Sequence, residues 1–118
     1  MKNAANREFS LRGSKLTAVA ALFATLSEPT RLRILQVVQH GPVSVGEIVE
    51  ATGMKQANAS KQLGILYQAG VVDRTRDGNL VRYSIKMPII YDLCHLVCNG
   101  LRDDANRRAA ELSVGRRR

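Results

Sequence analysis

The chain has 118 residues, of which 45% are hydrophobic, and a formal net charge of +8 at pH 7. This length suits one domain around one core, and the apolar content is typical of a globular chain rather than a disordered one. No segment approaches the ~18 consecutive apolar residues that a transmembrane helix requires, and the polar start does not resemble a secretory signal. We therefore expect a cytoplasmic protein that has no membrane partner.

The positive charge is concentrated in particular segments of the chain. Residues 55–86 carry a net charge of +4, residues 107–118 also carry +4 and residues 1–14 carry +2, whereas residues 15–54 are neutral and residues 87–106 carry −2. Clustered cations favour a phosphate backbone as partner, because each neutralised phosphate releases counterions. The alternative is that the charge only keeps the protein soluble.

Two helices are expected in the first third of the chain. Residues 1–13 show no periodicity and predict a flexible N-terminal arm. Apolar residues then recur at three- and four-residue spacing over 14–26, which predicts an amphipathic helix. In the next segment Ser27 can cap a second helix and Pro29 can stand in its first turn, and that helix would stop at Gly41.

The segment that follows has the pattern of a helix-turn-helix. Ser44 and Glu47 have the spacing of a capping box, in which a hydroxyl and a carboxylate each accept a bond from the other residue's backbone amide. Gly53 can end this helix in the left-handed conformation. A further helix is expected over about 55–68, and Gly70 closes it.

A β-hairpin and a long helix complete the pattern. Residues 71–76 and 79–85 flank a turn at Gly78, where a positive φ is required. Pro88 opens a last helix, and we expect Gly100 to bend it because a mid-helix glycine costs ~1 kcal/mol.

These elements predict a mainly α-helical fold with a small β-hairpin wing, a winged helix-turn-helix of about five helices. The domain is expected to span residues 14–112 and to be followed by a basic, disordered tail at 113–118. The first and last helices carry more apolar residues than so small a core can bury, so we expect them to form the interface of a homodimer. Twofold symmetry also fits a pseudo-palindromic operator in double-stranded DNA.

Polar residues at the start of the helix over 55–68 face outward when its apolar positions face the core. Their amides can bond adenine with two hydrogen bonds, and their lysines can reach guanine or a phosphate. Arginines of the hairpin are expected to contact phosphates or the minor groove. The alternative is an ordinary solvated surface. The candidate DNA-binding residues are Lys55, Gln56, Asn58, Ser60, Lys61, Gln62, Arg74, Arg76 and Arg82.

Three stretches of the sequence resemble the ArsR/SmtB family of winged-helix repressors. The segment Leu26-Ser-Glu-Pro-Thr-Arg-Leu-Arg-Ile-Leu35 is similar to the family's helix opening, and residues 53–72 are similar to its recognition helix. Gly78 and the strand 81–83 match its wing. The resemblance implies a homodimer that represses its operator until an inducer binds, typically a metal ion, a metalloid or a thiol-reactive species.

The metal sites best known in that family are missing from this chain. Residues 43–46 contain no thiol at the place where many relatives carry a Cys-x-Cys site. The last helix also lacks the Asp-x-His and His-x-x-Glu/His pattern of the zinc-binding relatives. Neither site can therefore be transferred to these residues.

Cys94 and Cys98 remain as the candidate inducer site. They are spaced i and i+4, so their sulfurs share one face of the last helix. Thiolates suit arsenite and soft or borderline ions such as Cd(II), Cu(I) and Zn(II). His95 is a candidate accessory ligand, although it points ~100° away from Cys94. The alternatives are that the two cysteines fill a core or act only in redox chemistry, and no organic cofactor is indicated.

The sequence thus predicts a dimeric transcriptional repressor that releases its operator when a metal or metalloid binds. Two alternatives use the same residues: a repressor that responds to thiol oxidation or to no metal, and a nucleoid-type DNA binder without sequence preference. An enzyme is not expected. The sequence has no catalytic triad at credible spacing, no phosphate-binding glycine loop and no paired carboxylates in an apolar setting.

Overall fold

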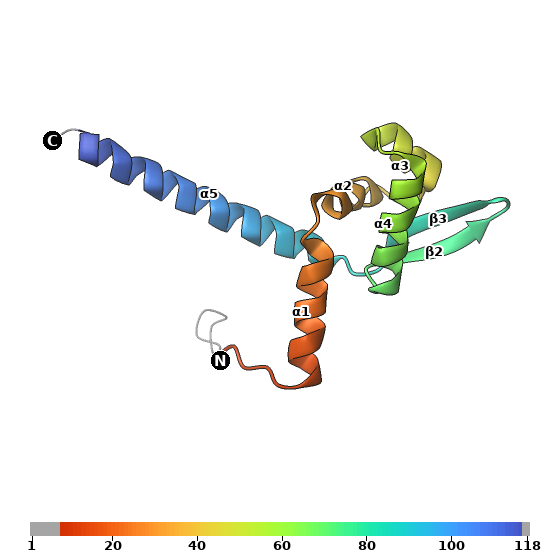
Figure 1. The fold of residues 1–118 in the computed structure, drawn as a ribbon, viewed down its shortest axis with the longest axis horizontal. Helices are drawn as coiled ribbons and strands as arrows, with labels where there is room; N and C mark the ends of the chain where they lie inside the picture. The colour runs from red at the N-terminus through yellow and green to blue at the C-terminus, as the bar shows by residue number, and fades with distance from the viewer. Residues whose placement is uncertain (1–7, 117–118) are drawn as a thin grey trace. The chain divides into compact units, whose positions relative to one another are not determined.

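The computed structural model describes residues 8–116, with side chains up to residue 113. Within these residues the fold has the predicted five helices and a small antiparallel sheet (Figure 1). The chain forms two compact units that divide after Lys86, and each is described by itself. The elements are α1 (Ser14–Leu26), α2 (Pro29–Val38), β1 (Val43–Ser44), α3 (Val45–Thr52), α4 (Gln56–Gln68), β2 (Val72–Asp77), β3 (Leu80–Ile85) and α5 (Ile89–Arg116).

The predicted start of the domain agrees with the structure, whereas its predicted end does not. α1 begins at Ser14 as predicted, and residues 8–12 before it form neither helix nor strand. The rest of the predicted arm, residues 1–7, lies outside the described residues. At the other end α5 continues to Arg116, so residues 113–116 extend the helix instead of starting the predicted tail. Residues 117–118 lie outside the described part of the chain.

The start of α2 is capped by a different residue from the one that the sequence predicted. The cap is Glu28, whose carboxylate accepts a hydrogen bond from the backbone amide of Thr30 (3.3 Å). The hydroxyl of Ser27 instead donates back to the carbonyl oxygen of Ala24 (2.6 Å) in the last turn of α1. Because only two residues separate the two helices, Ser27 serves the end of α1 and leaves the cap of α2 to its neighbour.

The capping box of α3 is confirmed. The Ser44 hydroxyl accepts from the Glu47 amide and the Glu47 carboxylate accepts from the Ser44 amide, both at 3.2 Å. Gly53 ends the helix with a φ of 75°, and its amide donates to the carbonyl oxygen of Val49 (2.8 Å). The reciprocal bonds and the left-handed glycine fix both ends of this short helix, from which α4 follows directly.

The core of the first unit lies between α2, α3, α4 and the sheet. Three apolar positions of α4, Ala59, Leu63 and Leu66, have 0% exposure. α2 and α3 both pack against α4, and Ile34 and Ile48 are equally buried on them. Because one side of α4 is held in this core, its opposite side must face solvent.

The sheet contains one strand that the sequence did not reveal. β1 has only two residues, and it pairs antiparallel with β3 to give the strand order β1-β3-β2. In the hairpin Asp77 pairs with Leu80, which leaves Gly78 and Asn79 as a two-residue loop. Gly78 has a φ of 64°, as the turn prediction required.

In the described part of the second unit, one helix, α5, follows Met87 and Pro88. α5 runs through Gly100 without interruption, so the predicted bend is not found (Figure 1). A glycine costs helix stability but breaks no backbone hydrogen bond, so the helix can continue across it. None of the helices in the described chain is long and apolar enough to cross a membrane.

Candidate nucleic-acid interface

The solvent-facing side of α4 carries most of the predicted reading residues. Its first turns contain two amides, a hydroxyl and a lysine that are all exposed, and a second lysine precedes the helix. Such side chains offer donors and acceptors without burying any apolar surface. The residues that the structure leaves exposed here are Lys55, Gln56, Asn58, Ser60 and Lys61.

Gln62 differs from that group because its amide is bonded within the protein. Gln62 is half-buried, and its Oε1 accepts a hydrogen bond from Nη1 of Arg31 (2.9 Å). Its Nε2 donates to Oδ1 of Asn58 (3.1 Å), one turn earlier on α4. The side chain predicted as a reader is thus positioned to orient a neighbouring one.

Arg31 is a site residue to which the sequence analysis assigned no role. Besides Gln62, its guanidinium binds two backbone carbonyls at the end of α1: Nε donates to Thr25 (2.6 Å) and Nη2 to Ala24 (3.4 Å). Arg31 therefore links α1, α2 and α4. Its position in the helix opening similar to the family's was the only signal, because contacts so distant in sequence leave no periodic pattern.

The hairpin has two faces with different charge. Arg74 lies opposite Tyr83 and Arg76 lies opposite Val81. Residues that face each other across antiparallel strands share one side of the sheet, so both arginines lie on the same face. Arg82 lies on the other face because side chains alternate along a strand.

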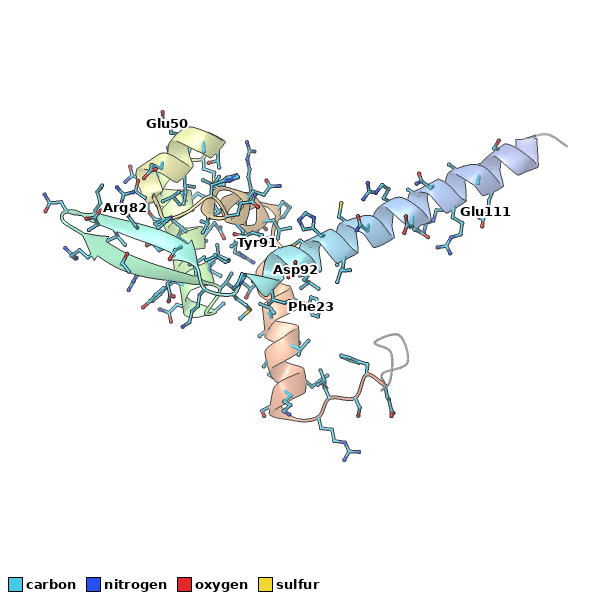
Figure 2. All side chains as sticks on the ribbon, turned by 180° about the vertical axis from the view of Figure 1, so that it is seen from behind. Phe23, Glu50, Arg82, Tyr91, Asp92 and Glu111 are labelled. Atoms are coloured by element: carbon cyan, nitrogen blue, oxygen red, sulfur yellow. The ribbon has the colours of Figure 1, made fainter. Side chains whose placement is uncertain are left out.

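Arg82, predicted to contact DNA, is paired with two carboxylates in the structure. Its Nη1 binds Oε1 of Glu47 (2.9 Å) and its Nε binds Oδ2 of Asp77 (3.1 Å). The bonds to Asp77 and Glu47 raise the pKa of the Arg82 guanidinium. In Figure 2 the labelled Arg82 lies on the side of the hairpin toward α3, which carries Glu47. This side chain ties the wing to α3, and contact with a phosphate stays a prediction.

The carboxylate of the capping residue Glu47 has a lowered pKa. The backbone amide and then the hydroxyl of Ser44 hydrogen-bond the Glu47 carboxylate, and with the Arg82 guanidinium they hold its pKa below the ordinary glutamate value. Glu47 is therefore a negative charge that the fold favours. Its charge is matched by Arg82, so it does not weaken the positive face of the wing.

The structure separates the charged residues of 55–86 into those in ion pairs and those without one. The two acidic residues of this segment are both in ion pairs, Asp77 with Arg82 and Asp73 with Lys86 (3.9 Å). The other four cations form no ion pair with any carboxylate among residues 8–113, and all four are exposed. Unpaired positive charge is available to phosphates without the cost of breaking an ion pair. These four residues are Lys55, Lys61, Arg74 and Arg76.

An aromatic ring supports one of these cations. The guanidinium of Arg74 lies 4.0 Å from the centroid of the Tyr67 ring, on the last turn of α4. This cation–π contact connects the recognition helix to β2 and restricts where the arginine can point. The sequence offered no signal for it, since the contact depends on how α4 and β2 pack.

The thiols of α5 are free and accessible. Cys94 is half-buried and Cys98 exposed, and neither forms a disulfide. His95 is also exposed. No group of three or more histidine, cysteine, aspartate or glutamate residues in the described chain is arranged to hold a metal. One copy of the chain thus contributes two thiols on one helical face and no completed ligand set.

α1 and α5 each carry large apolar side chains that remain exposed. On α1, Leu16 is 51% and Phe23 53% exposed, and Phe23 is labelled on that helix in Figure 2. On α5, Leu96, Leu101 and Leu112 are each at least 66% exposed. This is the surplus that the sequence predicted for a dimer interface.

The chain is similar to known helix-turn-helix regulators. A family model described as a helix-turn-helix domain matches residues 26–75. The uncharacterized HTH-type transcriptional regulator Rv0081 of Mycobacterium tuberculosis is 45% identical over 75 residues, which are 63% of this chain and 66% of the relative. A probable mercury resistance operon repressor of Streptomyces lividans is 39% identical over 77 residues, 65% of this chain and 62% of the relative. The matches thus span just under two thirds of these curated relatives.

Solved structures show the same fold. The crystal structure of Rv0081 aligns with a TM-score of 0.72 and 36% identity, over 83% of this chain and 99% of that one. The homodimeric winged helix-turn-helix DNA-binding domain of a Mycobacterium bovis protein aligns with a TM-score of 0.67 and 28% identity, over 80% and 92% of the two chains. That domain is described as part of a possible ArsR-family transcriptional regulator.

Proposed function

The chain belongs to the ArsR/SmtB family of winged helix-turn-helix transcriptional regulators, and from that premise we propose that it is a cytoplasmic, homodimeric repressor that binds a double-stranded DNA operator. Its relatives are named as regulators and repressors of transcription, in agreement with the prediction that the protein is not an enzyme. The proposed operator is pseudo-palindromic, because a twofold dimer presents two identical recognition helices.

The observation that carries this proposal is the combination of exposed amides and unpaired cations. Gln56 and Asn58 lie outward at the start of α4, where their amides can bond base edges in the major groove. Lys55 just before this helix and Lys61 on it, with Arg74 and Arg76 on the wing, supply charge for the phosphates. Sequence readout and backbone attraction are thus available from one surface.

The homodimer is supported by the exposed apolar side chains of α1 and α5. An apolar surface of this kind is costly in water and is stabilised by burial against a second copy. The Mycobacterium bovis relative is named as a homodimer. The interface through the first and last helices stays a prediction for this chain.

Selection from random duplex DNA tests the proposal. The full-length protein should enrich a motif with two related half-sites, about one helical turn apart between their centres. At physiological salt it should bind that motif at least ~10³-fold more tightly than a scrambled duplex. A nucleoid-type binder would enrich no motif and would show the same salt-dependent affinity for both duplexes, which would overturn the repressor proposal.

We further propose Cys94 and Cys98 as the inducer site, with arsenite or a soft ion such as Cd(II) or Cu(I), or borderline Zn(II), as the inducer. Both thiols are accessible, and their i, i+4 spacing places them on one face of α5. Four thiols from two chains would make a ligand set, with His95 as an accessory ligand. A relative is named as a probable mercury resistance operon repressor, which supports a thiol-seeking inducer.

Ligand at the α5 helices would then change the spacing or mobility of the two recognition helices. A coupling free energy of ~1–3 kcal/mol suffices to lower operator affinity usefully. The alternative within the family is a repressor that responds to oxidation of these thiols, or to no metal.

A further inference from the structure

A chain of hydrogen bonds runs from the end of α1 to the reading face of α4. The guanidinium of Arg31 holds Oε1 of Gln62 (2.9 Å), and Nε2 of Gln62 holds Oδ1 of Asn58 (3.1 Å). All the residues that form these hydrogen bonds lie in the first structural unit. Asn58 is the exposed end, and Arg31 and Gln62 are half-buried behind it.

The direction of these bonds is fixed by the chemistry of arginine. A guanidinium has only donors, so Gln62 must turn its oxygen toward Arg31 and its NH₂ group toward Asn58. Asn58 must then accept with its oxygen, which leaves the NH₂ group as its uncommitted donor. Without Arg31 both amides could reverse, because an amide's oxygen and nitrogen ends have the same shape.

Arg31 is itself held firmly in place. Its Nε donates to the carbonyl oxygen of Thr25 (2.6 Å), and its Nη2 donates to that of Ala24 (3.4 Å). These are among the last carbonyls of α1, which lack partners within their own helix. The carbonyl of Ala24 also accepts from the amide and the hydroxyl of Ser27. The planar fork of arginine can serve both carbonyls and Gln62 at once, which a lysine ammonium on its flexible stem does far less well.

We propose that Arg31 is a positioning residue that sets the hydrogen-bonding polarity of Asn58 and thereby its base preference. Asn58 then offers DNA a donor and favours a base edge with an acceptor in the major groove: N7 or O6 of guanine, N7 of adenine, or O4 of thymine. This inference rests on the proposed function. It adds that Arg31 and Gln62, which do not themselves contact the base, set the base preference of Asn58.

The substitution Gln62→Glu tests the polarity directly. A carboxylate still accepts from Arg31 but can no longer donate to Asn58, so Asn58 must donate its NH₂ group to residue 62 and present its oxygen outward. The base pair read by Asn58 is identified as the one whose preference disappears in Asn58→Ala. At that base pair we expect Gln62→Glu to move the preference toward adenine N6 or cytosine N4 donors by roughly tenfold.

A second variant removes the source of the polarity. Arg31→Met leaves Gln62 and Asn58 free to reverse, so the preference at the same base pair should flatten while the preference read by Gln56 is kept. Gln62→Glu retains the bonds of Arg31 to α1, so the proposal remains testable if Arg31→Met does not fold. Gln68→Glu, which adds the same charge at an exposed position near the other end of α4, is the control for a general loss of affinity.

The outcomes separate this inference from the function on which it rests. If wild-type protein enriches an operator motif and Gln62→Glu keeps the wild-type base preference with lower affinity, the polarity inference is wrong and the repressor proposal stands. If wild-type protein enriches no motif, the repressor proposal fails and takes this inference with it. A changed preference at the Asn58 base pair alone is a result that a purely structural role of Arg31 would not produce.

Discussion

At the scale of single residues, the polar side chains of α4 and the wing differ in what they already bond within the protein. Gln62 and Arg82 are committed to other side chains, whereas the side chain of Gln56 makes no hydrogen bond to the other described residues. A side chain without an internal partner breaks no hydrogen bond within the protein when it binds a base. Gln56 is therefore the residue whose removal should report base readout most cleanly.

We expect Gln56→Ala to cost ~1–3 kcal/mol of discrimination at one base pair of each half-site, because an amide that bonds a base edge twice is lost. Non-specific affinity for scrambled DNA should change little. Competition binding with every single-base variant of the selected operator measures both quantities. Gln68→Ala removes an exposed amide from the far end of the same helix and should behave as wild type. Unchanged discrimination in Gln56→Ala would mean that this residue reads no base.

The hairpin arginines allow a second prediction with a built-in comparison. Arg76→Ala should weaken binding to all sequences about equally and reduce the slope of log K against log salt concentration by about 1, because one phosphate contact is lost. Arg82→Ala removes the same formal charge, but that charge is paired with Glu47 and Asp77. Its effect should fall on protein stability and leave the salt slope closer to wild type.

Salt titrations of both variants against operator and scrambled duplex make this measurement. Equal slopes for Arg76→Ala and wild type would remove Arg76 from the interface. A full unit of slope lost in Arg82→Ala would show that DNA displaces its carboxylate partners.

At the scale of elements, the capping box makes the stability of α3 depend on pH. The folded state holds the pKa of Glu47 below its ordinary value, chiefly through bonds from Ser44 and then through Arg82. A carboxyl group with a lowered folded pKa stabilises the fold above its unfolded pKa, and this contribution disappears as the pH falls through the folded pKa. The helix-turn-helix should therefore weaken in acid.

We expect wild type to be more stable than Glu47→Gln at neutral pH, and this advantage to shrink progressively as the pH falls below the ordinary glutamate range. Thermal unfolding of both proteins from pH 7 to pH 3 measures the difference. Glu50→Gln removes a glutamate from an exposed position of the same helix and controls for the general loss of negative charge. A difference between wild type and Glu47→Gln that stays constant with pH would contradict the assigned role of this carboxylate.

The elements were predictable from sequence wherever their signals are local. The capping box, the left-handed Gly53 and the turn glycine Gly78 each need only neighbouring residues, and each is found as predicted. β1 was missed because two residues cannot show alternation and its partner strand lies far along the chain. The cap of α2 was misassigned because the short link between the helices makes Ser27 and Glu28 compete.

The candidate site was predictable only in part for a related reason. Helical periodicity was enough to place Gln56, Asn58 and Lys61 on the solvent side of α4. It could not distinguish Arg82 from Arg76, since both are hairpin arginines and only the tertiary contact with Glu47 separates them. The link from Arg31 to Gln62 was invisible for the same reason: it depends on how two helices pack.

At the scale of the whole molecule, the proposed dimer would bury the exposed apolar side chains of α1 and α5. We expect Leu101→Asp to yield a monomer, because a carboxylate buried at an apolar interface has no counter-ion and pays a large desolvation cost. Operator affinity should fall steeply, since one recognition helix would bind alone. Leu80→Asp, at the tip of the wing, adds the same charge to an exposed leucine outside both helices and should remain dimeric. Sedimentation analysis of the two variants decides between the outcomes.

The thiols of α5 are the proposed inducer site of the proposed dimer, and the stoichiometry of metal binding tests this assignment. Each chain offers two thiols, and its described residues form no group of three or more metal-ligating side chains. The proposed site therefore takes its ligands from two copies. Reduced dimer titrated with arsenite, Cd(II), Cu(I) or Zn(II) should reach saturation at one ion per dimer. For Cd(II) and Cu(I), thiolate-to-metal charge-transfer absorbance can follow the titration. Operator DNA should be released over the same range.

The variant Cys94→Ser/Cys98→Ser should fold, dimerise and bind operator as wild type does, because serine nearly matches the size of cysteine and both positions are at least partly accessible. It should lose both the metal signal and the release of DNA. Saturation at one ion per chain would instead place the site within each protomer. If the wild-type dimer binds no ion but releases DNA on mild oxidation, the two thiols act as a redox sensor, because reversible sulfur oxidation would replace metal ligation as the event that biases the dimer.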